Sequence, residues 1–156
     1  MLDKSKKTGN SNFSEEEIAR FDALADSWWD PSGKYKTALE FNRARLTVIK
    51  TQLENHFGKG NLPPDYSALS IIDIGSGGGL ISEPLAALGA KVTGIDASSV
   101  SVEVAKRHAL KSGVDVEYKH MLSSEAVMTG QQYDVVINAE VVEHVPNQRQ
   151  LINECA

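Results

Sequence analysis

The stretch IIDIGSGGGL, residues 71–80, decides the fold of this chain. An apolar run that contains one acid, Asp73, leads directly into the glycine-rich segment from Gly75 to Gly79, and residues 80–88 then have a helix-like composition. A strand, a glycine loop and a helix in this order are typical of nucleotide-binding α/β proteins. Because glycine lacks a Cβ atom, such a loop can turn tightly and bring its backbone close to a ligand. Taken alone, the glycines could instead form a structural turn that binds no ligand.

The residues around this loop narrow the kind of ligand. The alternating run KVTGI at 91–95 predicts a second strand that ends on Asp96, where a carboxylate can accept hydrogen bonds from both hydroxyls of a ribose. A dinucleotide-binding G-x-G-x-x-G segment that starts at Gly75 would need glycine where the chain has Leu80. Asp73 also places negative charge next to anything that the loop holds. The sequence therefore favours a cationic or amine-bearing nucleoside over a pyrophosphate.

Composition limits the class of protein. The chain has 156 residues, of which 41% are hydrophobic and 24% charged, as in a globular domain with one core. A formal net charge of -5 argues against a broad phosphate-binding surface, so we expect no nucleic-acid partner. The single cysteine, Cys155, fits a reducing compartment, and no apolar run reaches the roughly 18 residues of a membrane span. We expect a cytoplasmic protein.

The amino-terminal third is predicted to be helical. Residues 1–12 are polar and are expected to form a mobile tail, followed by a helical extension over residues 13–62. Within this extension, one helix begins at Ser14 and continues at helical spacing to Trp28, and a second runs from Ala38 to Phe57.

Three features of the extension concern packing or ligands. Phe41 is expected on the apolar stripe of the second helix. The pair Trp28-Trp29 either packs the first helix onto the body, or covers the ligand and anchors a lipid-like substrate. Arg43 and Arg45 are either solvated surface charges or a clamp for a carboxylate.

The remainder, residues 63–156, alternates between strand and helix patterns. Further strands are expected at Val114–Lys119 and Tyr133–Ala139, with helices over residues 98–112, near 124–128 and from 146 onward. This alternation predicts an α/β fold with a doubly wound, mostly parallel, Rossmann-like sheet. Ligands of such sheets bind at the carboxyl ends of the strands.

A second group of polar residues follows the fourth predicted strand. If Glu140, Glu143 and His144 lie on a helical coil, they share one face and can bind a hard or borderline divalent cation such as Mg²⁺. His144 can alternatively act as a general base, or simply satisfy backbone groups as a loop histidine.

The chain resembles a known family in several segments at once. Asp73 to Gly79 is similar to the first motif of class I S-adenosylmethionine-dependent methyltransferases. The wider resemblance, from Glu17 to Ala156, is to the ubiquinone-biosynthesis O-methyltransferase family. It is carried by that motif together with Phe21, Trp28-Trp29-Asp30, Gly33, Asn42, Arg45 and the run Glu140, Glu143-His144-Val145-Pro146.

The resemblance implies methyl transfer from S-adenosylmethionine to a phenolic hydroxyl of a polyprenylated ring. Peripheral contact with the inner membrane face, or with a ubiquinone-biosynthesis complex, would accompany such a substrate. The implied cofactor-binding residues are Arg45, Asp73, Gly75, Gly77, Asp96 and the backbone at Ala139. Glu140, Glu143 and His144 match positions that bind a divalent metal in some members, and His144 is the expected catalytic residue.

The sequence also departs from the family pattern. Ser76 stands where the family usually has cysteine, Arg43 where it often has proline, and histidine is often found near Glu40. The family's sheet has seven strands, whereas this sequence stops in the helix after the fourth. We therefore expect an incomplete S-adenosylmethionine-binding domain, truncated after the fourth strand. Its open edge is expected to expose Val135, Val136, Ile137, Val141 and Val142 and to favour self-association.

Such a chain is expected to bind cofactor weakly and to transfer no methyl group by itself. Two other functions compete with that of an active enzyme. One is non-catalytic cofactor binding, and the other is that of an NAD(P)-dependent oxidoreductase, which shares the strand, loop and helix plan.

Overall fold

The computed structural model describes residues 14–22, 27–33 and 36–156 of the 156-residue chain. The tail predicted at residues 1–12 lies outside the described residues.

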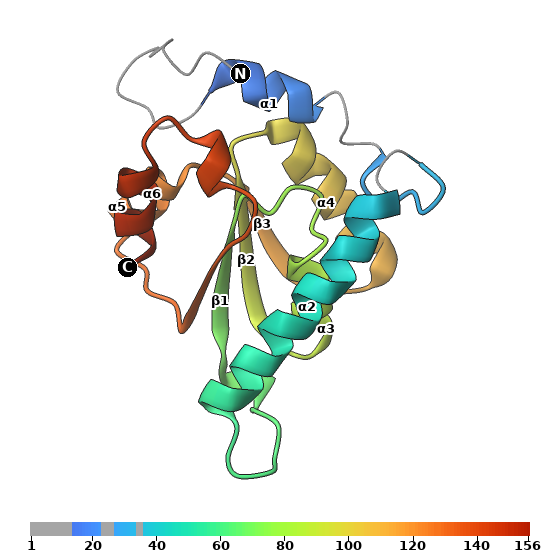
Figure 1. Ribbon diagram of the computed structural model, residues 1–156, viewed down its shortest axis with the longest axis vertical. Helices are drawn as coiled ribbons and strands as arrows, with labels where there is room; N and C mark the ends of the chain where they lie inside the picture. The colour runs from blue at the N-terminus through green and yellow to red at the C-terminus, as the bar shows by residue number, and fades with distance from the viewer. Residues whose placement is uncertain (1–13, 23–26, 34–35) are drawn as a thin grey trace.

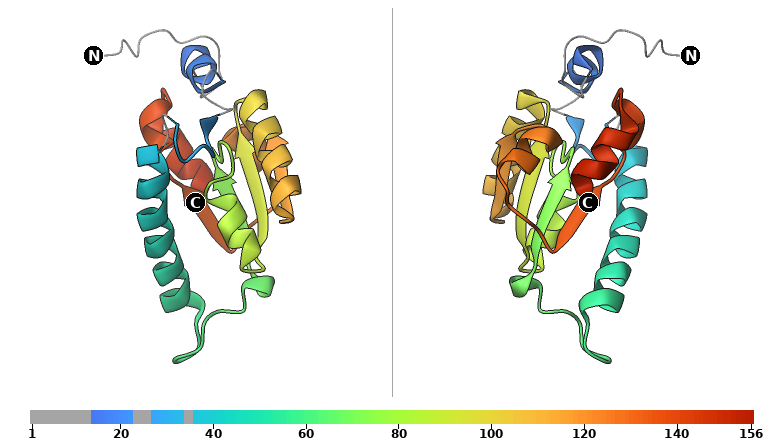
Figure 2. Two further views of the ribbon diagram at one scale, coloured as in Figure 1. Left: turned by 90° about the vertical axis from the view of Figure 1, so that its right-hand side faces the viewer. Right: turned by 90° about the vertical axis from the view of Figure 1, so that its left-hand side faces the viewer.

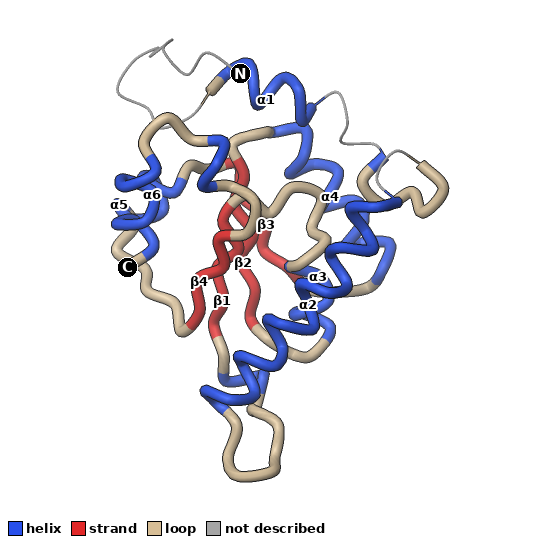
Figure 3. Tube along the Cα trace, in the orientation of Figure 1, coloured by secondary structure: helices blue, strands red, loops and turns tan. Residues whose placement is uncertain are grey.

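Four parallel strands form the centre of the molecule (Figure 3). They are β1 (Ser70–Ile74), β2 (Lys91–Asp96), β3 (Val116–His120) and β4 (Val135–Asn138), in the spatial order β3-β2-β1-β4. The chain moves outward from β1 through β2 to β3 and then crosses to the other side of β1 to form β4. The strand order therefore reverses between β1 and β4, where ligands of such sheets bind. This confirms the predicted parallel, doubly wound sheet.

Helices cover both faces of the sheet (Figures 1 and 2). On one face lie α2 (Lys36–Phe57), α3 (Ser82–Ala87) and α4 (Ser99–Ser112), and on the other α5 (Ser123–Met128) and α6 (Gln148–Cys155). Leu53 of α2 and Leu85 of α3 pack against Ile71 in the first core cluster. Leu151 of α6 packs with Ile72 and Ile74 in the second. The alternation of side chains along β1 thus supplies both cores.

Local sequence explains the ends of α4. The Ser98 hydroxyl accepts a hydrogen bond from the Ser101 N–H at 3.0 Å, and Gly113 ends the helix in the left-handed conformation, with φ of 70°. Both were predicted from the sequence. Other predicted boundaries shift by a few residues, since β3 begins at Val116 and β4 at Val135.

The first predicted helix is shorter than its apolar spacing indicates. Helix α1 (Glu15–Asp22) begins where the capping pattern predicts, but Trp28 and Trp29 lie in a turn closed by the Asp30 N–H and the Ser27 carbonyl at 3.2 Å. The prediction of a helix through Trp28 is therefore wrong at its end. The physical reason is tertiary, because both indoles contact the glycine loop, as described below.

Two predictions about exposure are also wrong. Phe41 is 66% exposed rather than part of a buried stripe, and Ile137 is only 7% exposed because it packs in the first core cluster. Val136, which alternates with Ile137 on the edge strand β4, is 38% exposed, as expected.

None of the described helices is both long enough and apolar enough to cross a bilayer.

Candidate functional site

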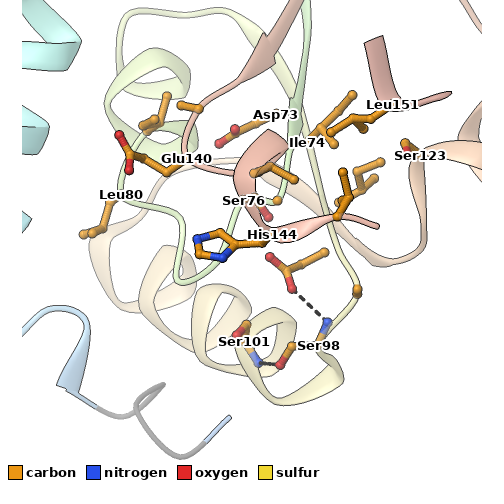
Figure 4. Close-up of a pocket in the computed structure, with 18 of the residues that line it drawn as sticks. Asp73, Ile74, Ser76, Leu80, Ser98, Ser101, Ser123, Glu140, His144 and Leu151 are labelled. Atoms are coloured by element: carbon orange, nitrogen blue, oxygen red, sulfur yellow. Dashed lines mark hydrogen bonds between the residues drawn. The ribbon is translucent and has the colours of Figure 1, made fainter. Parts of the chain in front are cut away.

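A cavity opens where the strand order reverses, at the carboxyl ends of the strands (Figure 4). Its volume is about 650 Å³, which is in the range of small-molecule sites. Its walls come from segments far apart in the sequence, from Ser14 and Trp28 near the amino terminus to Leu151 of α6. Among the predicted site residues, Arg45, Asp73, Gly75, Asp96, Ala139, Glu140 and His144 line it.

The glycine loop forms one wall of this cavity. The N–H groups of Gly75 and Ser76 both donate to the Ile95 carbonyl, at 2.9 and 3.0 Å, which ties the loop to the tip of β2. Gly77 has a φ of 52°, and a Cβ atom added there would overlap the ring of Trp28. Gly77 is not among the residues that line the cavity, and it contributes to the site through its N–H group instead.

Asp96 is fixed by the backbone at the end of β2. Its carboxylate accepts hydrogen bonds from the Gly77 N–H and from the Ser98 N–H, each at 2.8 Å. These two bonds orient the carboxylate, and each oxygen of a carboxylate can accept more than one donor. The side chain that the sequence assigns to a ribose is therefore already oriented in the cavity wall.

Asp73 lies beneath the loop and is only 2% exposed. Burial raises the pKa of its carboxyl group to about 7, the hydroxyl of Ser82 opposes this by donating a hydrogen bond at 2.6 Å, and the charge of Asp96 adds to the rise. A positive charge in the cavity would favour the ionised form of Asp73. This agrees with the cationic ligand inferred from the sequence.

Arg45 and Glu140 form an ion pair across the cavity rim. Their closest nitrogen and oxygen atoms are 2.8 Å apart, and the side chains are 30% and 66% exposed. Glu140 has a φ of 60°, in the left-handed region that residues other than glycine rarely adopt. Arg45 therefore binds a carboxylate, as predicted for a carboxylate clamp. In this structure that carboxylate is the side chain of Glu140 rather than part of a ligand.

The predicted metal ligands are not brought together. Only Val142–His144 forms a helical turn, of the 3₁₀ type, and Glu140 precedes it in a left-handed conformation, so the assumed common face does not form. Nε2 of His144 and Oε1 of Glu143 are 3.9 Å apart. In the described part of the chain, no three His, Cys, Asp or Glu side chains are close enough to hold a metal ion. We therefore derive no step through a metal.

Several residues of the site carry no recognisable pattern in the sequence. Ser76 and Ser101 are among the residues that line the cavity, and their hydroxyls are buried with no hydrogen-bond partner within the described ranges. Ser82, the partner of Asp73, was likewise not predicted as a site residue, whereas Trp29, which was predicted either to pack or to cover the ligand, contacts the glycine loop.

Known proteins share both the sequence and the fold. Residues 72–156 match the family model described as methyltransferase domain. A ubiquinone biosynthesis O-methyltransferase of Chelativorans sp. (strain BNC1) is 43% identical over 141 residues, covering 90% of this chain and 56% of the relative. Another, from Paramagnetospirillum magneticum, is 47% identical over 135 residues, covering 86% and 54%. The chain thus spans about half the length of the curated relatives it matches.

Solved structures support the same assignment of fold. The magnesium protoporphyrin IX methyltransferase of Synechocystis PCC 6803, crystallised with bound S-adenosylmethionine, has a TM-score of 0.67 and 24% identity. The match covers 95% of this chain and 73% of that structure. The resemblance seen in the sequence and the predicted fold are therefore confirmed, and the chain belongs to the methyltransferase domain family.

Proposed function

We propose that this chain forms the S-adenosylmethionine-binding part of an O-methyltransferase that acts on a polyprenylated phenol in ubiquinone biosynthesis. The observation that carries the proposal is the cavity at the strand reversal. It combines an oriented Asp96, the glycine loop and an arginine that binds a carboxylate. The relatives named for this activity support the choice of substrate class.

Each part of the cofactor has a complementary group in the cavity. Asp96 would accept the ribose hydroxyls, and Gly75 and Ala139 would approach the nucleoside through their backbones. Arg45 would bind the carboxylate of the amino-acid tail. Asp73 would place its negative charge near the cationic portion of the cofactor. When bound, S-adenosylmethionine supplies a methyl group on a positively charged sulfur. The protein then mainly has to align the acceptor oxygen and remove its proton.

His144 is the proposed base. Its ring lines the cavity and its side chain is 31% exposed, so a phenol can reach it (Figure 4). Imidazole is a common general base, so His144 can accept the phenol proton as the oxygen attacks the methyl carbon. The alternative set of Glu140, Glu143 and His144 around Mg²⁺ remains a prediction. Titration of the chain with Mg²⁺ decides between the two. Binding of Mg²⁺ that is lost in Glu143→Ala would favour the metal site over His144 as a simple base.

The exposed Phe41 suggests where the prenyl chain is placed. It lines the cavity and is 66% exposed, so it can contact an apolar tail that leaves the cavity mouth. Because a polyprenyl tail stays in the membrane, we propose peripheral contact with the inner membrane face.

A transfer assay tests the proposed function. The chain itself, and a chimera in which residues 1–156 precede the remaining part of the Chelativorans relative, are incubated with methyl-labelled S-adenosylmethionine and a short-chain prenylated catechol. Label in the extracted phenol, lost in His144→Ala, supports the enzyme. Cofactor binding without transfer by the chimera would favour the non-catalytic alternative, and binding of NAD alone would favour the oxidoreductase.

A further inference from the structure

A connected set of side chains lies outside the cavity and reaches the glycine loop from behind. The indole N–H of Trp29 donates to the Gly78 carbonyl at 2.7 Å. The indole stacks on the ring of His108, with centroids 3.6 Å apart and planes at 2°. His108 Nδ1 in turn lies 2.8 Å from the carboxylate of Glu83, which is almost completely buried.

This set joins three elements that are distant in the sequence. Trp29 comes from the amino-terminal extension, Glu83 from the first turn of α3 and His108 from α4. A buried carboxylate needs hydrogen-bond donors, so Glu83 fixes the His108 ring with a hydrogen on Nδ1. The hydroxyl of Ser112 also lies 3.1 Å from that nitrogen. A ring fixed in this way gives Trp29 a rigid surface to stack on.

The same contacts reach the ligand side of the loop. The Gly78 carbonyl bound by Trp29 belongs to the residue next to Gly77, whose N–H group donates to Asp96 at 2.8 Å. Space on the far side of the loop is also filled, because a Cβ atom added at Gly79 would overlap the hydroxyl of Tyr118. The glycines of the loop are therefore packed closely against the tryptophan rings and Tyr118.

We propose that Trp29 and His108 are positioning residues that hold the loop segment Gly77-Gly78 so that Asp96 meets the ribose of the ligand. The proposal rests on the proposed function, because the ligand is taken to be an S-adenosyl nucleoside. Neither side chain lines the cavity, so both act through the loop rather than by contact with the ligand.

Fluorescence first tests whether the stack exists in solution. The chain has two tryptophans, so Trp28→Phe leaves Trp29 as the single indole. In this parent, His108→Ala should change the emission of Trp29, because it removes the stacked ring. His56→Ala is the matched control, since it removes a histidine that contacts Phe57 at the far end of α2. An emission that responds equally to both substitutions, or to neither, contradicts the stack.

Calorimetry with S-adenosylhomocysteine then tests positioning with the unsubstituted chain as parent, because Trp28 itself lines the cavity. Trp29→Phe keeps an aromatic ring but loses the donor to Gly78, and should raise the dissociation constant about threefold to tenfold. His108→Ala should have a similar effect, and the double variant should be no weaker than the weaker single variant, because both substitutions break one connection. His56→Ala should bind like the parent.

The outcomes separate the inference from the proposed function. A parent that does not bind S-adenosylhomocysteine contradicts the proposed function. A parent that binds, with Trp29→Phe and His108→Ala of unchanged affinity, contradicts only the positioning role. Independent, additive losses would also overturn it, since they would show two separate contributions to stability rather than one connection to the loop.

Discussion

Asp73 is the residue whose ionisation the fold alters most clearly. Because burial raises its pKa from 3.8 to about 7, the folded state favours the protonated carboxyl. The resulting stabilisation is fully present below about pH 4 and is lost as the pH rises through about 7. Relative to Asp73→Asn, the free energy of unfolding of the unsubstituted chain should fall across this interval by a few kcal/mol.

Urea unfolding at several pH values measures this difference. Asp115→Asn is the matched control, because Asp115 is exposed and outside the cavity, and its curve should run parallel to that of the unsubstituted chain. A parallel curve for Asp73→Asn as well would show that the fold does not favour a protonated Asp73.

Asp96 is the residue on which nucleoside binding depends most directly. Replacement by alanine removes an acceptor of two backbone N–H groups as well as the acceptor for the ribose. Asp96→Ala should therefore weaken binding of S-adenosylhomocysteine by about 1.5–3 kcal/mol, the range for hydrogen bonds to a charged group. Calorimetry measures the loss, with Asp115→Ala as control. Equal affinities for the two variants would remove Asp96 from the site.

At the scale of elements, the ion pair between α2 and the tip of β4 competes with the proposed ligand. If Arg45 binds the carboxylate of the cofactor, Glu140 has to release it first. Glu140→Gln should then tighten binding of S-adenosylhomocysteine by about twofold to fivefold, which corresponds to an exposed ion pair of up to roughly 1 kcal/mol. Glu103→Gln, which breaks the exposed pair with Lys106 on α4, is the matched control. Weaker binding by Glu140→Gln would instead show that the pair builds the site.

The predictability of the elements follows from the range of the interactions that define them. The helix from Ser99 to Ser112 could be predicted because its signals, Ser98 and Gly113, are local. The end of the first helix could not be predicted, because Trp29 lies in a turn and donates a hydrogen bond to the Gly78 carbonyl, 49 residues away. The common face predicted for Glu140, Glu143 and His144 does not form for a backbone reason. Glu140 is left-handed, so it does not continue a helix into His144.

At the scale of the whole molecule, the site could be located from the sequence because all parallel strands end on the same side of the sheet. This rule places Gly75, Asp96 and Ala139 around one cavity without knowledge of their contacts. It does not place residues whose position depends on side-chain packing between distant segments. Ser82, which donates a hydrogen bond to Asp73, and His108, which stacks on Trp29, are residues of this kind.

The central claim is that the cavity is built for a cationic nucleoside rather than a dinucleotide. Leu80 replaces the glycine that a pyrophosphate-binding loop requires, and Asp73 would repel phosphates. The most direct measurement is calorimetric titration of the chain with S-adenosylmethionine, S-adenosylhomocysteine and NAD under the same conditions. The account predicts binding of the two S-adenosyl compounds and none, or far weaker binding, of NAD. Tighter binding of NAD than of S-adenosylhomocysteine would contradict it.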